Sequence, residues 1–362
     1  MRVLIVGAGI AGLSLAHFLK ERGISYDLID QTPEWRTIGY NMLVWPNGIR
    51  LLPKTVQRNV TNKGARITGN LILAEDGSVI QRFSFSSLIK RHGSAYQVLR
   101  DDLHQALRRG IKVRLNTVVR TLQQAGIRVH VQFSDKKKKS YDFVVGADGV
   151  DSSVRSHVTK QKPRFSGITG WLFWYPKKTR PHEILTQWGS GCFFGLYPHC
   201  KGARSAAYLA FATKRHLRTS NAHFVRRFAG MGGMIPEIIR SLPKKVYHHD
   251  HQFVRLRSWH KGSVVLIGDA AHCMPPPMGM GASLAIEDAF VLASELKKGG
   301  HALDRFEQKR RPRVEQVQKE ARFIERLLAW PRLLYPVRKF MLKHLYQYLF
   351  MHVVDTILSE RP

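Results

Sequence analysis

The stretch RVLIVGAGIAGLSLAHFLKERGISYDLID, residues 2–30, decides the fold of this chain. Its apolar residues 2–6 predict a buried strand, residues 11–22 an amphipathic helix, and residues 26–29 a second strand. A strand, a helix and a strand in this order form a β-α-β unit with parallel strands. The chain therefore begins with the unit from which α/β sheets are built.

Three glycines lie between the first strand and the helix, with the spacing Gly7-x-Gly9-x-x-Gly12. The first glycine of such a motif permits a tight turn, the second lets the backbone approach a pyrophosphate, and the third lets helix and strand pack closely. The helix N-terminus adds partial positive charge. Asp30, at the end of the second strand, is placed to accept hydrogen bonds from a ribose. The motif predicts a dinucleotide site and does not by itself separate FAD from NAD.

The composition is ordinary for a globular protein except in its charge. The 362 residues suffice for about two to three domains, and 44% of them are hydrophobic. Lys and Arg number 58 against 26 Asp and Glu, and the net charge of +32 favours anionic partners without naming one. The three cysteines are too few for a disulfide framework and favour a reduced, cytoplasmic chain. The four lysines at 136–139 are interpreted as a charged hairpin tip, so we expect no nucleic-acid partner.

Beyond the first unit, segments typical of a nucleotide-binding domain alternate with segments typical of an antiparallel sheet. Residues 69–85 predict a hairpin, 100–109 a helix and 143–146 another buried strand. Aromatic-rich alternating segments between 165 and 257 predict an antiparallel sheet. Nucleotide-type signals resume at Ser263, so we predict that a sheet domain interrupts the first domain. The predicted boundaries are 1–69, 96–163 and 262–330 for the first domain, 70–95 and 164–261 for the sheet domain, and 331–362 for basic C-terminal helices.

Two further stretches identify the family. DFVVGADGVDSSVR (142–155) and VVLIGDAAHCMPPPMGMGASLAIEDA (264–289) resemble, in order and spacing, the second and third fingerprints of the FAD-dependent aromatic hydroxylases, single-component group A flavoprotein monooxygenases of the para-hydroxybenzoate hydroxylase type. YNMLVWPNGIRLL (40–52) and VLRDDLHQAL (98–107) fit the same family. The resemblance covers nearly the whole chain. It implies an α/β fold with a Rossmann-like (GR2-type) FAD-binding domain, an interrupting antiparallel-sheet substrate domain and C-terminal helices.

The resemblance also assigns cofactor-binding residues. In the first unit, they are Gly7, Gly9, Ala11, Gly12 and Asp30. Near the pyrophosphate, ribose and adenine, they are Arg36, Arg100 and the backbone of Val119. The second fingerprint supplies Asp148 and Gly149, which the family also uses in handling NAD(P)H. The third supplies Asp269 for the ribityl chain, Pro276 for the isoalloxazine, and Gly279, Gly281 and Ala282 at a helix start that faces the pyrimidine.

Physical chemistry supports this assignment of the third fingerprint. Prolines hold a loop extended and donate no N–H, so they offer a flat ring a rigid apolar wall. A helix N-terminus adds unpaired donors and about half a positive charge, which suits the anionic pyrimidine of a reduced flavin. The family commonly places amides at the positions of Met280 and Ser283, and we expect Ser283 to take over the missing contact with the flavin.

The implied enzyme is an FAD-dependent monooxygenase. NAD(P)H serves as a transient co-substrate, and dioxygen forms a flavin hydroperoxide that hydroxylates a small aromatic, polycyclic or other electron-rich molecule. The expected substrate lining is aromatic, although alternating aromatics also fit an ordinary core. Tyr197 and His199 are candidate bases, but we assign no catalytic residue, and we predict no metal site. The predicted lining residues are Trp171, Phe173, Trp188, Phe194 and Tyr197.

Three alternatives stay open. WLFWYP (171–176) suggests a flavin-dependent halogenase, although the tryptophan spacing of that family's motif is missing. The basic, amphipathic run after Trp330 suggests a quinone or polyprenyl-phenol hydroxylase at a membrane surface, or an electrostatic binding protein with structural FAD. We favour helices that pack on the FAD domain over helices that lie on lipid.

Overall fold

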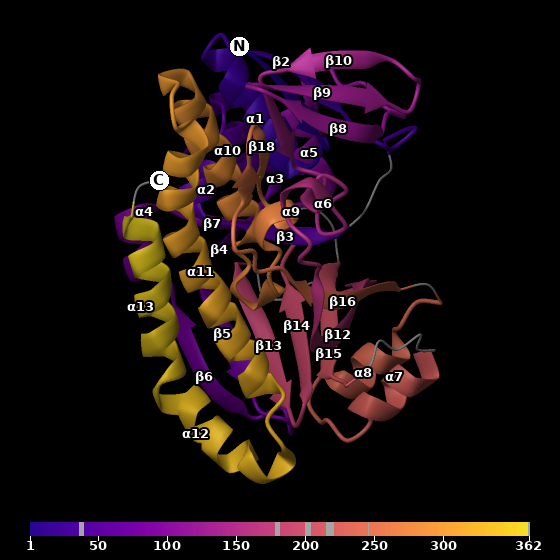
Figure 1. Ribbon diagram of the computed structural model, residues 1–362. Coiled ribbons are helices and arrows are strands. Elements are labelled where there is room, and N and C mark those ends of the chain that lie inside the picture. The colour runs from indigo at the N-terminus through magenta and orange to yellow at the C-terminus, as the bar shows by residue number, and fades with distance from the viewer. Residues whose placement is uncertain (36–39, 178–181, 200–203, 215–220, 245, 361–362) are drawn as a thin grey trace.

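The computed structural model describes residues 1–35, 40–177, 182–199, 204–214, 221–244 and 246–360 (Figure 1). Its N-terminal unit is β1 (Arg2–Val6), α1 (Ile10–Glu21) and β2 (Ser25–Ile29), as the opening stretch predicts. β1 pairs in parallel with β2 on one side and with β11 (Phe143–Gly146) on the other, and β11 pairs in parallel with β18 (Val264–Leu266). The short β17 (His260–Lys261) closes the order β17-β18-β11-β1-β2. Segments far apart in the chain thus build one sheet, which is parallel except for the antiparallel pairing of β17 with β18.

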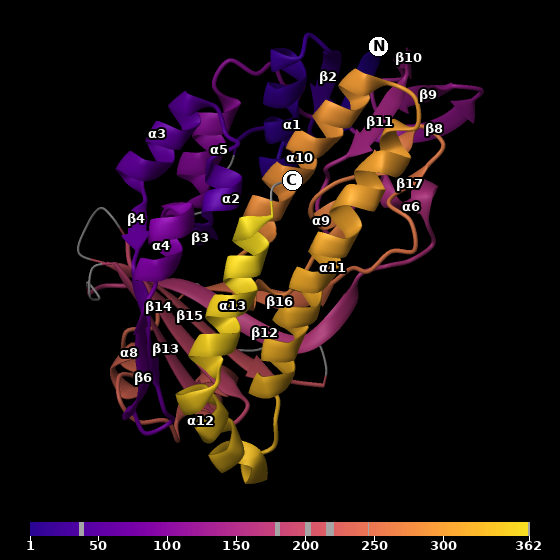
Figure 2. The ribbon, with the colours of Figure 1, turned by 90° about the vertical axis from the view of Figure 1, so that its left-hand side faces the viewer.

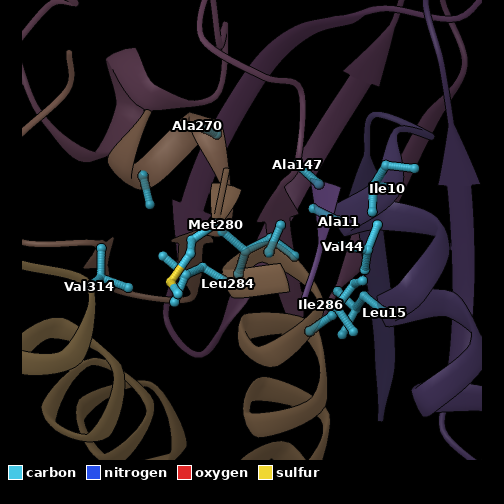
Figure 3. Close-up of a cluster of buried hydrophobic side chains, with 14 of the residues drawn as sticks. Ile10, Ala11, Leu15, Val44, Ala147, Ala270, Met280, Leu284, Ile286 and Val314 are labelled. Carbon is cyan, nitrogen blue, oxygen red and sulfur yellow. The ribbon is translucent and has the colours of Figure 1, made fainter. Parts of the chain in front are cut away.

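Two helices form the core beside this sheet. α10 (Gly281–Lys298) packs against α1, and Figure 3 shows Leu15 of α1 beside Ile286 of α10 in a buried cluster. The close approach of α1 to the turn that follows β1 depends on Gly12, because a Cβ there would lie 1.9 Å from the carbonyl oxygen of Gly7. Gly7 itself has φ +102°, a conformation that favours glycine. The outer glycines of the motif therefore serve the fold.

A seven-stranded sheet forms the second unit, in the order β16-β12-β15-β14-β13-β5-β6. Its strands are antiparallel neighbours except β13 and β5, which run parallel. The predicted hairpin at 69–85 supplies β5 and β6, so an early segment completes a sheet built mainly from residues beyond 163. The strands are β5 (Gly69–Leu73), β6 (Val79–Ser84), β12 (Arg164–Tyr175), β13 (Glu183–Gly189), β14 (Cys192–Tyr197), β15 (Ser205–Ala212) and β16 (Tyr247–Phe253).

Smaller elements complete the two units. Lys136 and Lys137 lie at the β9–β10 turn of a three-stranded sheet, as the hairpin-tip interpretation expects, and Lys138 and Lys139 begin β10. The remaining strands are β3 (Asn41–Val44), β4 (Ala65–Ile67), β7 (Ala95–Leu99), β8 (Val119–Ala125), β9 (Arg128–Phe133) and β10 (Lys138–Tyr141). The shorter helices are α2 (Pro46–Ile49), α3 (Lys54–Lys63), α4 (Ser86–His92), α5 (Arg100–Arg108), α6 (Arg155–Val158), α7 (Asn221–Phe228), α8 (Ile235–Arg240), α9 (Asp269–His272) and η1 (Pro276–Met278).

The C-terminal helices run back along both units (Figures 1 and 2). α11 (Ala302–Leu328) ends before Pro331, and η2 (Arg332–Leu334) leads into α12 (Tyr335–His344) and α13 (Tyr346–Ser359). α12 contacts β6, and α13 contacts α4. Within the described part of the chain, no helix combines the length and the apolar character that a bilayer crossing requires. The fold matches the predicted α/β class, with the one parallel pairing of the second sheet as a correction.

A buried ionic cluster joins α10 to α11. Arg310 contacts Glu287 at 2.7 Å and Asp288 at 2.8 Å, and Arg313 contacts Glu287 at 2.6 Å. Asp288 also accepts hydrogen bonds from the backbone N–H of Gly268 and from the ring of His272. His272 therefore has a structural partner, and the cluster fixes the loop that precedes α10.

Candidate active site

A cavity of about 520 Å³ lies where the two units meet. On the parallel-sheet side, its wall consists of the glycine loop, the proline loop and the start of α10. On the other side, its wall comes from the seven-stranded sheet and from helices α11 and α13. The predicted cofactor residues that line it are Gly9, Ala11, Arg100, Gly149, Asp269, Pro276, Gly279, Gly281 and Ala282.

The middle glycine of the motif faces this cavity. A Cβ added at Gly9 would meet no atom within 4 Å, so the backbone there is open to an approaching group. Asp30 lies behind the loop, where its carboxylate accepts hydrogen bonds of 2.8 Å from the N–H groups of Ala8 and Thr32. Gly7, Gly12 and Asp30 are outside the cavity lining and shape the loop from behind.

The second fingerprint forms a loop that is tied to the third. The Asp148 carboxylate accepts hydrogen bonds from the N–H groups of Ser153 and Val154, which turns the chain into α6. The buried Arg155 guanidinium donates to the carbonyls of Ala270, at 2.8 Å, and Asp269, at 3.1 Å. Asp148 is therefore used within its loop, while its neighbour Gly149 lines the cavity.

Asp269 lines the cavity, and its side chain is exposed there. The surrounding protein raises the pKa of its carboxyl group by desolvation, although His272 and Arg155 oppose that shift. Its backbone also begins α9, where Arg155 holds it. The position suits a carboxylate that accepts hydrogen bonds from hydroxyl groups of a bound molecule.

The proline loop and the start of α10 form one continuous wall. Pro275, Pro276 and Pro277 line the cavity, and Gly279 follows with φ +60°, which turns the chain into the helix. The cavity-facing residues of the first turns are Gly281, Ala282 and Ala285.

The structure corrects the expectation for Ser283. Its side chain is fully buried, and its hydroxyl accepts a hydrogen bond of 2.9 Å from the N–H of Trp45. It packs against Gly48, where a Cβ would lie 3.0 Å from the Ser283 hydroxyl. Met280 is also buried. Both side chains therefore stabilise the start of α10 from the protein side instead of contacting the cavity.

Strand alternation decides which aromatic residues line the cavity. Trp188 and Tyr197 do so, as predicted. Trp171, Phe173 and Phe194 belong to a separate core on the opposite face of the sheet, with the helices α7 and α8. The correction follows from the period of two along a strand, because neighbouring residues point to opposite faces. Residues that the prediction left out supply the remaining lining of the sheet and the helices, among them Leu172, Ile184, Phe193, Tyr208, Tyr346 and Phe350.

A buried chain of hydrogen bonds ends at the cavity and was missed by the sequence analysis. The Tyr208 hydroxyl bonds to Nε2 of His251, and Nδ1 of His251 lies 2.5 Å from Oε1 of Glu325. Ser166 donates a further hydrogen bond of 3.0 Å to Glu325. An ionised carboxylate only accepts, so the His251 proton belongs on Nδ1 and Nε2 accepts from Tyr208. All three side chains of this relay, Tyr208, His251 and Glu325, line the cavity.

Gly170 makes room for the relay. It lies on β12, between the strand of Tyr208 and the strand of His251. A Cβ at Gly170 would lie 2.4 Å from the Tyr208 hydroxyl. The missing side chain lets that hydroxyl reach across β12 to the imidazole. The stretch HHDH (248–251) carried the signal, but only the sheet register shows that His251 faces the cavity.

The other titratable groups of this wall are held neutral. Burial, with His251 as the next cause, lowers the pKa of His249 to about 4. Burial raises the pKa of the hydroxyls of Tyr208, Tyr197 and Tyr346. On this wall, His249 and the three tyrosine hydroxyls therefore carry no charge at neutral pH.

The remaining predicted residues lie elsewhere. His199 contacts Trp174, with ring centroids 5.2 Å apart, and is outside the cavity lining. Val119 begins β8, also outside that lining, and Arg36 falls outside the described residues. Among the described residues, no group of three or more His, Cys, Asp or Glu side chains forms a metal site.

Comparisons with known proteins agree with this geometry. The FAD binding domain family matches residues 1–321. The 2-heptyl-3-hydroxy-4(1H)-quinolone synthase of Pseudomonas aeruginosa is 33% identical over 350 residues, covering 91% of this chain and 90% of that protein. The aurachin C monooxygenase/isomerase of Stigmatella aurantiaca is 31% identical, covering 81% of this chain and 80% of that protein.

Solved structures show the same architecture. An HpxO variant of Klebsiella pneumoniae, complexed with FAD, superposes with a TM-score of 0.90 at 25% identity and covers 99% of both chains. The family match extends over most of the chain, and the two named relatives are similar over most of their own length. The chain therefore belongs to the FAD binding domain family and is a flavoprotein monooxygenase.

Proposed function

We propose that this protein uses NAD(P)H and dioxygen to hydroxylate an apolar bicyclic aromatic substrate of the 4-quinolone class, and that the relay removes a proton from that substrate. The observation that carries the proposal is the junction of an aromatic cavity with the buried chain Tyr208–His251–Glu325. One relative supports the substrate class, because it is named as a 2-heptyl-3-hydroxy-4(1H)-quinolone synthase.

The residues of the cavity fit FAD. The open backbone at Gly9 and the N-terminus of α1 suit a pyrophosphate, and Asp269 suits the hydroxyls of the ribityl chain. Pro276 and the start of α10 suit a flat ring with negative charge at one edge. When bound and reduced by NAD(P)H, FAD supplies the activated oxygen for the reaction.

The opposite wall fits an apolar aromatic molecule. Trp188, Phe193 and Phe350 line it. Among the described residues that line this half, Glu325 is the one residue from the set Asp, Glu, Lys and Arg. Tyrosine and histidine rings complete the wall, and the pKa of His249 near 4 keeps that ring uncharged at neutral pH. A small substrate that depends on ion pairing would find few charged partners on this wall. An alkyl-substituted ring system would bury its apolar surface against the apolar side chains of the wall.

The relay supplies the proton chemistry. The substrate N–H or O–H donates its proton to the Tyr208 oxygen while Tyr208 passes its own proton to Nε2 of His251. The resulting imidazolium is paired with the Glu325 carboxylate, so the relay itself carries no net charge and the negative charge lies on the substrate. Loss of the proton raises the electron density of the substrate ring, which favours its attack on an electrophilic oxygen. Water is excluded because the three side chains are buried.

Product analysis with purified, FAD-loaded protein tests the function. We expect 2-heptyl-4(1H)-quinolone to stimulate NADH or NADPH oxidation and to yield a product that carries one oxygen atom from labelled dioxygen. The small polar acid 4-hydroxybenzoate serves as the comparison and should give little stimulation. Efficient hydroxylation of 4-hydroxybenzoate, with no reaction of the quinolone, would overturn the substrate class. A chlorinated product in the presence of chloride would overturn the hydroxylation.

A further inference from the structure

The C-terminal helices expose a large apolar surface. Most of the large apolar side chains that are exposed in the described structure lie in the segment from η2 to α13, including Leu345 between α12 and α13. Leu333 is 88% exposed, Tyr348 72% and Phe340 60%. Single exposed apolar residues are common on protein surfaces, but a contiguous group marks an interaction site. We call this group the C-terminal apolar face, and it consists of Leu333, Leu334, Val337, Phe340, Leu345, Tyr348 and Leu349.

The face follows from the helical spacing, and it is held in place from behind. Val337 and Phe340 are three residues apart on α12, so they share one side, and Leu333 is exposed in η2 just before the helix. Arg338, on the other side, is buried and donates hydrogen bonds to the carbonyls of Gly189, at 2.6 Å, and Leu328, at 3.1 Å. This anchor directs the apolar residues of α12 outward.

The charge of this segment points to an anionic partner. Residues 329–354 contain no Asp or Glu, and the exposed Arg332 and Lys343 lie among the apolar side chains. A bilayer with acidic headgroups offers negative charge and an apolar interior in one surface. A second copy of this chain would bring a further net charge of +32 against the first, which opposes association.

We infer that the C-terminal apolar face docks on the surface of an anionic membrane. The apolar side chains enter the boundary between headgroups and acyl chains, while Arg332 and Lys343 contact lipid phosphates. The opposite side of α13 contributes Tyr346 and Phe350 to the cavity. One helix therefore places the cavity wall next to the phase in which an apolar substrate dissolves.

Vesicle flotation of the FAD-loaded protein tests the inference. We expect binding to vesicles of phosphatidylglycerol and phosphatidylcholine, and weak binding to phosphatidylcholine alone. Phe340→Glu together with Leu333→Glu should reduce binding by at least about tenfold, because it removes two anchors and adds two repelling charges. Ile127→Glu is the matched control, because Ile127 is 86% exposed at the β8–β9 turn, at the opposite end of the molecule (Figure 1).

A second pair of variants separates docking from general attraction. One double variant combines Arg332→Glu with Lys343→Glu. The other combines Lys136→Glu with Lys138→Glu, and both change the net charge by the same amount. The C-terminal pair should weaken binding by about fivefold for each residue changed, and the other pair much less. Equal losses in both pairs, or no binding to anionic vesicles at low salt, would overturn the inference. So would a stable dimer in light scattering that Phe340→Glu dissociates. Because no substrate is present, failure here is independent of the proposed function.

Discussion

Substituting His251→Gln interrupts the proposed relay between Tyr208 and Glu325 while keeping a polar side chain in the wall. Positioned acid–base groups contribute about 10²–10⁴-fold to a rate, so kcat for quinolone hydroxylation at pH 7 should fall by about that factor. KM should change much less, because the aromatic lining stays intact. NAD(P)H oxidation should continue, so the fraction of reducing equivalents recovered in product should also fall.

The pH profile distinguishes a proton relay from a structural role. The loss should shrink as the pH rises through the pKa of the substrate, because the substrate then loses its proton in solution. Gly170→Ala should reproduce this profile with all three relay side chains present, since its Cβ would lie 2.4 Å from the Tyr208 hydroxyl and displace it. At each pH, NAD(P)H consumption is followed in a continuous assay, and the hydroxylated product is quantified after the reaction is stopped.

Two variants on the opposite face of the sheet serve as controls. Tyr175→Phe removes a buried hydroxyl that donates to Glu237 at 2.5 Å, and His248→Gln removes a ring that bonds to Thr169 at 2.6 Å. Both should keep the kcat and the pH profile of the unmodified protein. A His251→Gln enzyme that retains FAD and shows an unchanged kcat and pH profile refutes the relay. The same result with Glu325→Gln would place the proton acceptor elsewhere.

Three further predictions concern the cofactor and the stability of the fold. Gly9→Leu should fold with an unchanged melting temperature but lose the yellow colour of bound flavin, because the leucine side chain enters open space in the cavity. Gly12→Ala should instead reduce the yield of folded protein, because its Cβ would lie 1.9 Å from a backbone oxygen. Arg310→Met should lower the free energy of unfolding by about 3–5 kcal/mol in urea titrations, since it leaves Glu287 and Asp288 buried without that partner. Burial favours protonated Asp288, but the neighbouring histidine and Arg310 hold the pKa of its carboxyl group well below its ordinary value. The ionised carboxylate therefore stabilises the folded state above about pH 4, and this stabilisation is lost at lower pH. The urea midpoint should accordingly fall between about pH 5 and 3. Constant midpoints across that range would contradict this assignment.

The sequence by itself determined the parallel-sheet unit and the family. β1, β2 and β11 lie where apolar runs predict them, because a buried strand needs a continuous apolar segment. Gly12 is equally local, because its Cβ would meet Gly7 within one β-α turn. Gly7 is required by its φ of +102° and also by the close approach of the backbone of Ala147, which is distant in sequence. The loop from Gly268 to Gly281 also identified itself, because its prolines restrict φ and its glycines permit the positive φ seen at Gly268 and Gly279.

Only the tertiary structure decided which side chains face the cavity. Trp171 and Leu172 are neighbours in sequence, yet the first joins a separate core and the second lines the cavity, since a shift of one residue changes the face of a strand. Tyr208, His251 and Glu325 come from β15, β16 and α11, and no short-range pattern joins them. Their contact depends on the strand order β16-β12-β15 and on the space left by Gly170. Pairing between distant segments is a property of the folded chain, and the proposed proton route depends on it.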